Sequence, residues 1–319
     1  MTSQQLTSLA RASKGVGLGG HQGDAPPRPR RRRRRGLVTL LVMVLPSVVL
    51  LVVINGYPLV FAAIQALTNG NLVQVGKFIG LQNFVAAVTL PGFWPAVRFT
   101  IIFTIVGVFG SWIIGLGLAL LTKTRVHARG VIRTLLLLPW IVPIVVSSTS
   151  WNWLVATSTS PIPLLLKSLG FGNVLFLADP TLAQITVLAF KVWVSFPFML
   201  LMMGSALAGV DENVYEAARV DGASRSQTFF RITLPLIARP TYISWILMVI
   251  FCINDFPIVY LLTGGGPIGS TNTLVVLAYQ EVFSNFQTGP GVAIAFIMTI
   301  VAVIVSLVLF RQIRKADIE

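Results

Sequence analysis

Long apolar stretches, nearly free of charge, constrain the fold of this 319-residue chain more than any other feature. Crossing the hydrocarbon core of a bilayer takes about 20 apolar residues. Six stretches reach that length, and they lie near residues 37–57, 97–121, 132–156, 182–206, 242–263 and 292–310. Each stretch is continuous rather than alternating, which favours helices over barrel strands. Only 11% of the residues are charged, against about a quarter in soluble domains. We therefore predict an all-α polytopic membrane protein with six transmembrane helices.

The basic residues lie almost entirely on one side of these spans. If the N-terminus is cytoplasmic, 20 of the 24 basic residues lie on the cytoplasmic side or at the cytoplasmic end of a span. The four exceptions are Lys77, Arg98, Lys167 and Lys191. By the positive-inside rule, both termini are predicted to be cytoplasmic. The net charge of +14 is thus an orientation signal and not evidence for nucleic-acid binding. The arginine run that begins at Arg28 is also suited to contact with anionic membrane lipid.

Chemistry-bearing motifs are missing. The sequence has no G-x-x-x-x-G-K-[ST] phosphate loop, no metal-ligand spacing and no G-x-S-x-G elbow. The single cysteine, Cys252, excludes an intramolecular disulfide, and the two histidines lie in basic polar segments where solvated roles are expected. No catalytic, cofactor-binding or metal site is predicted, and the chain is not expected to be an enzyme.

Two ionisable residues fall well inside predicted spans, away from the span ends at which Arg98 and Arg133 lie. Asp255 is the one acid inside a span, and such residues are expensive and often functional. A structural hydrogen bond to a neighbouring helix is an equally good interpretation. Lys191 lies in the outer part of the fourth span, and we favour the interpretation that its side chain snorkels to the interface.

Residues 211–241 form an unusually long polar connection, in which Asp211 can cap a first short helix. Gly222 supplies a residue free to take positive φ, and Ser224 or Ser226 can cap a second helix. Pro235 is placed where that second helix stops or kinks. The pattern predicts a helix–turn–helix at the cytoplasmic face, longer than a connector requires.

The same loop carries a specific pattern, E-A-A, three residues, Gly, nine residues, then I-x-L-P. The spacing resembles the loop of permease subunits of binding-protein-dependent ABC importers, which forms the coupling helix against the ATPase. GYPL at 56–59, FIGLQNF at 78–84, PWIVP at 139–143 and LLTGGGP at 261–267 resemble the carbohydrate branch of the MalF and UgpA type. The residues that the resemblance assigns to ATPase coupling are Glu216, Ala217, Ala218, Asp221, Gly222, Ala223, Ile232, Leu234 and Pro235.

The resemblance implies a type I ABC importer transmembrane fold in a bacterial inner membrane. It also implies the partners: a second permease subunit, two ATPase subunits and an extracytoplasmic substrate-binding protein. Trp151, Trp153 and Asp255 are the candidates for the path of a sugar, although each tryptophan alone is more simply an interface anchor. In some relatives, the partner permease holds most of the substrate.

The resulting organisation has four parts. They are a disordered basic cytoplasmic tail (1–35), a first helix with an outer loop (36–95), a core of five helices with the coupling loop 211–240 (96–311) and a cytoplasmic C-terminal tail (312–319). Two alternatives stay open: a secondary transporter or channel driven by an ion gradient, and a membrane enzyme acting on lipid-linked sugars, both using Asp255.

Overall fold

The computed structural model describes residues 42–74, 76–123 and 128–316. These residues form helices and connecting loops, with one isolated β-bridge between Thr68 and Phe78. Four helices are long and apolar enough to cross a membrane, and up to six spans result if each of two bent helix pairs counts as one. The predicted all-α membrane fold is confirmed, whereas the number of spans depends on the bent pairs. The predicted tail over residues 1–35 lies outside the described residues.

The chain divides into two compact units, Met1–Pro58 and Leu59–Glu319. The described part of the first unit is helical from residue 42 and includes the π-helical segment η1 (Val52–Gly56). With α3 (Tyr57–Leu67) it makes the apolar span Val42–Leu67. This span extends past residue 57, where the sequence predicted its end.

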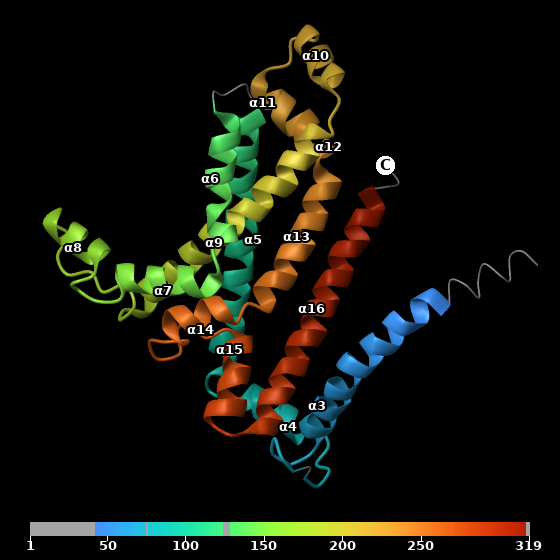
Figure 1. The fold of residues 1–319 in the computed structure, drawn as a ribbon, viewed down its shortest axis with the longest axis vertical. Helices are drawn as coiled ribbons and strands as arrows, with labels where there is room; N and C mark the ends of the chain where they lie inside the picture. Colours follow the sequence, from blue (N-terminus) through green and yellow to red (C-terminus); the bar gives the residue numbers. More distant parts are fainter. Residues whose placement is uncertain (1–41, 75, 124–127, 317–319) are drawn as a thin grey trace, which may run out of the picture. The chain divides into compact units, whose positions relative to one another are not determined.

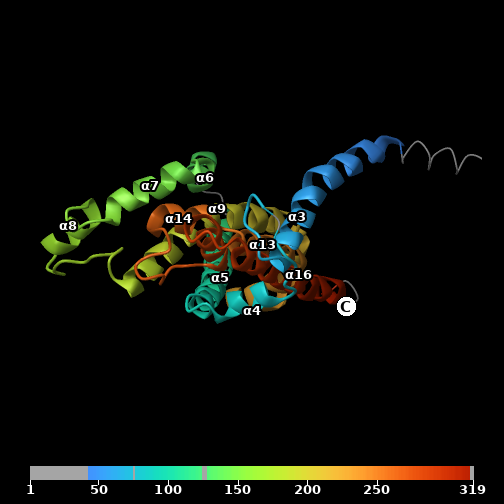
Figure 2. The ribbon, with the colours of Figure 1, turned by 90° about the horizontal axis from the view of Figure 1, so that it is seen from below.

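Four long helices of the second unit lie side by side: α5 (Phe93–Lys123), α9 (Pro180–Ala208), α13 (Ala238–Ile253) and α16 (Thr288–Ala316) (Figures 1 and 2). Local sequence explains why α9 begins where it does. The Asp179 side chain accepts a hydrogen bond of 2.8 Å from the amide of Leu182, and Pro180 occupies the first turn, where its missing N–H costs nothing. The second, fourth and sixth predicted spans correspond to α5, α9 and α16.

Small residues bring α5 and α9 together. A Cβ placed on Gly115 would lie 2.6 Å from Cβ of Met199, so only glycine permits this approach. Close backbone approach of this kind is how membrane helices gain dispersion energy, because lipid offers no hydrophobic driving force between them. Phe103, Phe190 and Met199 are completely buried around the contact. The buried core continues from this contact to residues of α13 and α16, such as Met248 and Ile294.

The third predicted span is not one continuous helix, and that part of the prediction was wrong. Helices α6 (Arg129–Ile141) and α7 (Ile144–Val155) meet at an angle of 89°. Pro143 explains the break, because a proline lacks the amide for the helical hydrogen bond and disfavours helical backbone in the residue before it. Val142 accordingly takes extended backbone, with φ −65° and ψ 131°.

The fifth span also differs from its prediction over 242–263. Helix α13 ends at Ile253, and a new helix, α14 (Pro257–Thr263), starts after a three-residue break, with Pro257 in its first turn. At its other end α13 meets the helical run Arg225–Leu236 at 66°. Asp255 therefore lies in a break between helices rather than inside a helix.

Shorter helices occupy both ends of the second unit (Figure 1). At one end lie α10 (Glu212–Val220), α11 (Arg225–Gln227) and α12 (Leu234–Leu236), with the π-helical η2 (Thr228–Thr233) between the last two. The opposite end holds α4 (Gln82–Thr89), α14, α15 (Leu274–Tyr279) and η3 (Gln280–Ser284). Helix α8 (Pro161–Ser168) follows α7.

Candidate functional site

The polar connection folds as the predicted helix–turn–helix. Helix α10 is capped by Asp211, whose carboxylate accepts a hydrogen bond of 3.0 Å from the amide of Asn213. Ser224 caps the second helix through a reciprocal pair of bonds. Its hydroxyl accepts from the amide of Gln227 at 3.2 Å, and its own amide donates to the Gln227 side chain at 2.7 Å. Such a capping box satisfies two backbone donors at once and fixes the start of the helix.

Gly222 forms the turn between the two helices with a φ of 74°. Its amide donates to the carbonyl of Arg219, and the amide of Ala223 donates to the carbonyl of Ala218, at 3.2 and 2.9 Å. This pair of bonds is the Schellman arrangement, in which the residue after the helix takes left-handed backbone and is usually glycine. A side chain at this position costs about 1–2 kcal/mol in backbone strain. The glycine of the E-A-A…G pattern is therefore required by the turn itself.

The helix–turn–helix presents the pattern residues unevenly to solvent. Glu216, Ala217, Asp221, Gly222 and Pro235 are exposed, Ala223, Ile232 and Leu234 are half-buried, and Ala218 is buried at 5% exposure. Glu216 lies 3.9 Å from Arg219 one turn away, an exposed ion pair of little energetic weight. The element therefore offers an open, small-residue surface on α10.

Two contacts hold this element against the ends of the long helices. Phe229 and Leu234 pack on a buried cluster formed by Leu116, Ala119, Leu200, Met203, Leu207 and Ile237. On the first helix, Nζ of Lys123 lies 4.0 Å from the ring centroid of Tyr215, within cation–π range. The helical run ends at Leu236, one residue after Pro235, and the chain then bends by 66° into α13. These contacts join the helix–turn–helix to the ends of α5 and α9.

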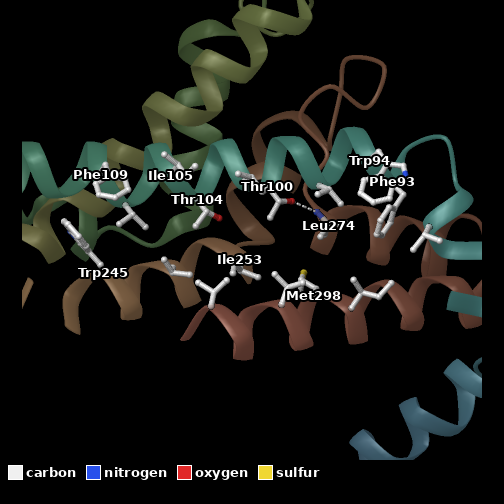
Figure 3. A pocket seen from close by; sticks show the side chains of 18 residues that line it. Phe93, Trp94, Thr100, Thr104, Ile105, Phe109, Trp245, Ile253, Leu274 and Met298 are labelled. Atoms are coloured by element: carbon white, nitrogen blue, oxygen red, sulfur yellow. Dashed lines mark hydrogen bonds between the residues drawn. The ribbon is translucent and has the colours of Figure 1, made fainter. Parts of the chain in front are cut away.

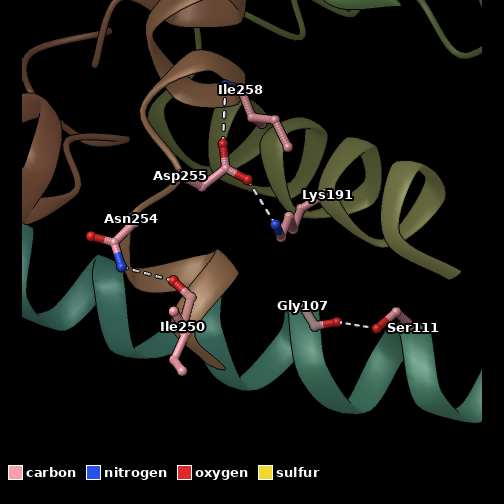
Figure 4. A network of polar contacts seen from close by, with 7 residues as sticks. All are labelled: Gly107, Ser111, Lys191, Ile250, Asn254, Asp255 and Ile258. Atoms are coloured by element: carbon pink, nitrogen blue, oxygen red, sulfur yellow. Dashed lines mark hydrogen bonds and ion pairs between the residues drawn. The ribbon is translucent and has the colours of Figure 1, made fainter. Parts of the chain in front are cut away.

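A second polar centre lies inside the unit, where Lys191 of α9 meets Asp255. Nζ of Lys191 donates to Oδ2 of Asp255 at 2.7 Å, and the side chains are only 4% and 11% exposed (Figure 4). The amide of Ile258 donates to the other carboxylate oxygen at 3.3 Å. The prediction that Lys191 snorkels to the interface was wrong. Its ammonium turns inward because a charge without a partner in the apolar interior costs far more than a paired one.

The ion pair lies on the wall of a cavity of about 410 Å³ between α6, α7, α9, α13 and α14. Besides Lys191 and Asp255, polar or aromatic groups on the wall come from Trp140, Ser195 and Phe198. Sequence reasoning singled out Asp255 but missed these neighbours, because they come from segments far apart in the chain. The charges of Lys191 and Asp255 within apolar runs were the signals that pointed to this cavity.

The two tryptophans predicted with Asp255 lie elsewhere. The Trp151 ring is half-buried against Phe190 and Trp193, at centroid distances of 5.1 and 5.5 Å. Trp153 is 68% exposed and lines a shallow hollow with Thr149 and Ser150. The structure therefore does not bring the three predicted residues into one cavity.

A larger, apolar cavity of about 570 Å³ opens between α5, α13 and α16 (Figure 3). Its wall includes Phe109, Trp245, Ile253 and Met298, and the amide of Leu274 donates to Oγ1 of Thr100 at 2.9 Å beside it. The wall carries no ionisable side chain. Across the described residues, no group of three or more His, Cys, Asp or Glu is placed to hold a metal ion.

Comparison with known proteins gives a consistent picture. The family model described as "binding-protein-dependent transport system inner membrane component" matches residues 112–316. The chain is 34% identical over 238 residues to the trehalose/maltose transport system permease protein MalF of Thermococcus litoralis, covering 75% of this chain and 80% of that protein. It is 33% identical over 277 residues to the sulfoquinovosyl glycerol transport system permease protein SmoG of Agrobacterium fabrum, covering 85% and 89%.

Solved structures agree at the level of the fold. A chain from a bacterial ABC transporter involved in the import of the acidic polysaccharide alginate has a TM-score of 0.78 and 20% sequence identity. That match covers 89% of this chain and 98% of the other. The arrangement of helices is therefore shared.

Proposed function

This chain belongs to the family of binding-protein-dependent transport system inner membrane components, and we propose that it is the permease subunit of an ATP-driven importer for a sugar or a related carbohydrate. Members of this family are membrane components and not catalysts, so the chain itself is not an enzyme. The substrate class rests on relatives such as the trehalose/maltose and sulfoquinovosyl glycerol permeases.

One observation carries the proposal most strongly: an anchored helix–turn–helix that exposes E-A-A at one end of the long helices, in a chain without any phosphate-binding loop. An ATP-driven machine needs such a loop, so hydrolysis has to occur in separate subunits that dock on this chain. Residues Glu216–Ala217 and the Gly222 turn present a surface that another protein can approach closely. The residues proposed for coupling are those predicted from the pattern, Glu216, Ala217, Ala218, Asp221, Gly222, Ala223, Ile232, Leu234 and Pro235.

The proposed mechanism is alternating access. Closure of the two ATPase subunits displaces α10, and the anchoring of α10–α12 on α5, α9 and α13 converts this displacement into movement of the spans. Packed interfaces of this kind switch between two arrangements rather than deform continuously. Nucleotide binding can therefore open the path to one side of the membrane at a time.

For the substrate path we propose the cavity beside Lys191 and Asp255. Trp151 and Trp153 of α7 line no part of this cavity, and we propose that they contact the substrate elsewhere on the path. The carboxylate of Asp255 can accept hydrogen bonds from sugar hydroxyls, and the ring of Trp140 gives the cavity an apolar wall. Pairing with Lys191 favours this role over that of a free proton relay, as an ion-gradient-driven transporter would require. A second permease subunit completes the path.

The remaining partners and the orientation follow from the same proposal. An extracytoplasmic binding protein delivers the substrate, as the family description and the solved alginate transporter in complex with its periplasmic protein suggest. Helix α10 and both termini then face the cytoplasm of a bacterial cell, in agreement with the excess of basic residues there.

The decisive test is reconstitution. The gene for this chain is co-expressed with the neighbouring permease and ATPase genes, and the proteins that co-purify are identified. Uptake into proteoliposomes is then measured with and without ATP. Association with an ATPase and uptake only with ATP are expected. Transport by this chain alone, driven by an ion gradient, would refute the proposal. The ligand of the neighbouring binding protein then identifies the carbohydrate.

A further inference from the structure

A third cavity, of about 300 Å³, lies between α5, α6 and α9 at the end that carries α10. Two cationic side chains line it, Lys123 and Arg133, together with the hydroxyl of Ser205. No acidic residue is on its wall. The rest of the lining is apolar, including Leu137 and Leu201. The helix–turn–helix is anchored partly on this wall, through Lys123, Ala119, Leu200 and Leu207, whereas Arg133 and Ser205 take no part in that anchoring.

Two polar groups of this cavity lack partners within the described part of the chain. The guanidinium of Arg133 is half-buried and makes no ion pair or hydrogen bond to any described residue. The Ser205 side chain is exposed, and its hydroxyl makes no hydrogen bond to any described residue. A half-buried cation without a counter-charge favours an anion nearby. Two cations and a hydroxyl around one cavity match the oxygens of a phosphate group.

The depth of the cavity indicates where that phosphate comes from. Helix α5 has 31 residues, which at 1.5 Å per residue is roughly 46 Å, against a hydrocarbon core of about 30 Å. Its last residue, Lys123, therefore reaches the headgroup layer. Leu137 and Leu201 continue the wall with apolar surface that suits an acyl chain.

We infer that this cavity binds the headgroup of an anionic phospholipid. Lys123 and Arg133 donate to the phosphate oxygens, Ser205 donates a further hydrogen bond, and an acyl chain lies along Leu137 and Leu201. Basic pockets between membrane helices on the cytoplasmic side recognise anionic headgroups by the same combination of charge and apolar wall. The site is separate from the Lys191–Asp255 cavity and from the exposed surface of α10.

The choice of variants follows from the contacts. Lys123 also lies over the ring of Tyr215, so its substitution would disturb α10 as well as the cavity. Arg133 has no such second role among the described residues, which makes Arg133→Gln the cleaner change. Gly204 offers a second, independent variant, because a Cβ added there meets no atom within 4 Å. Gly204→Leu places an apolar side chain on the cavity wall and leaves both cationic residues unsubstituted.

The test uses the full-length chain, purified in a neutral detergent and titrated with phosphatidylglycerol, phosphatidylcholine or inorganic phosphate. Bound lipid is counted by native mass spectrometry, and thermal unfolding confirms that each variant is folded. Wild type should prefer phosphatidylglycerol to phosphatidylcholine. Arg133→Gln should weaken phosphatidylglycerol binding about fivefold, as expected for one basic residue, and Gly204→Leu should weaken it too. Lys167→Gln, at an exposed basic residue of α8 outside the cavity, should leave binding unchanged.

Three results would overturn the inference. The first is phosphatidylglycerol binding that neither Arg133→Gln nor Gly204→Leu changes. The second is saturation of the wild-type site by inorganic phosphate with no preference between the two lipids, which would assign the cavity to a soluble anion. The third is an assembled complex in which no lipid is retained and Arg133→Gln instead releases a protein subunit, which would assign the cavity to a partner's carboxylate.

Discussion

Nζ of Lys191 lies 2.7 Å from Oδ2 of Asp255, and both side chains are almost completely withdrawn from solvent. The two residues stand 64 positions apart in the sequence. Their pair joins α9 to the break between α13 and α14, so it fixes the position of both segments beside the cavity proposed for the substrate.

Breaking this pair on one side should destabilise the protein. Lys191→Met leaves the Asp255 carboxylate buried without a counter-charge, and Asp255→Asn does the same to the ammonium. Removing one partner of a buried ion pair typically lowers the free energy of unfolding by about 3–5 kcal/mol, whereas replacing both partners by uncharged residues often leaves it nearly unchanged. Each single variant should unfold at lower temperature in detergent, and the double variant should recover most of the loss. Equal instability of the double variant would argue against the pair as the cause.

The same variants separate stability from transport. If Asp255 contacts the substrate, the Lys191→Met/Asp255→Asn protein should be stable yet take up substrate poorly in proteoliposomes. Asn at position 255 can still accept the hydrogen bond from the amide of Ile258, so the start of α14 is kept. Recovery of uptake together with stability would assign the pair a purely structural role.

Coupling should depend on the left-handed backbone at Gly222, which Asn can adopt and a β-branched residue cannot adopt without strain. Gly222→Val places a β-branched residue at a φ of 74°, at a cost of about 1–2 kcal/mol in strain that the short helices relieve by rearranging. We expect normal membrane insertion but loss of ATP-dependent uptake. Asn tolerates left-handed backbone, so Gly222→Asn should retain most uptake and serves as the control. Similar uptake in both variants would show that the turn does not matter.

Charge reversal on α10 should weaken docking of the ATPase. Glu216→Arg removes an exposed carboxylate whose one ion-pair partner among the described residues, Arg219, lies at 3.9 Å, so the fold should be unaffected. Less ATPase should co-purify with this variant. Glu212→Arg makes the same change of charge on the same helix, outside the E-A-A pattern. An equal loss in both variants would point to general electrostatics instead of a specific contact.

A side chain at Gly115 should destabilise the protein, because α5 and α9 lie too close together there to leave room for it. In Gly115→Val the new Cβ meets Met199 at 2.6 Å, and overpacking of this kind costs roughly 1–3 kcal/mol. A Cβ at Gly117 meets nothing within 4 Å, so Gly117→Val is the matched control on the same helix. Thermal unfolding should separate the two variants, and equal melting temperatures would contradict the tight contact.

The membrane class, the spans α5, α9 and α16, and the helix–turn–helix over residues 211–236 were predictable from the amino-acid sequence. These features depend on residues close together in the chain. Apolar runs specify spanning helices, and Asp211, Gly222 and Ser224 act on backbone groups within a few positions. Spans and helix caps of this kind can be predicted without knowing which other segments they contact in the fold.

Three features became visible only in the folded structure: the ion pair between Lys191 and Asp255, the breaks in the third and fifth spans, and the sets of side chains that line each cavity. An ionisable residue in an apolar run looks isolated in sequence, and its partner depends on which helices lie side by side. A proline is compatible with a mild kink or a full break, so the 89° bend at Pro143 and the separate helix that starts at Pro257 are seen only in the structure. The basic cavity of Lys123 and Arg133 arose in the same way, from segments that meet only after the chain has folded.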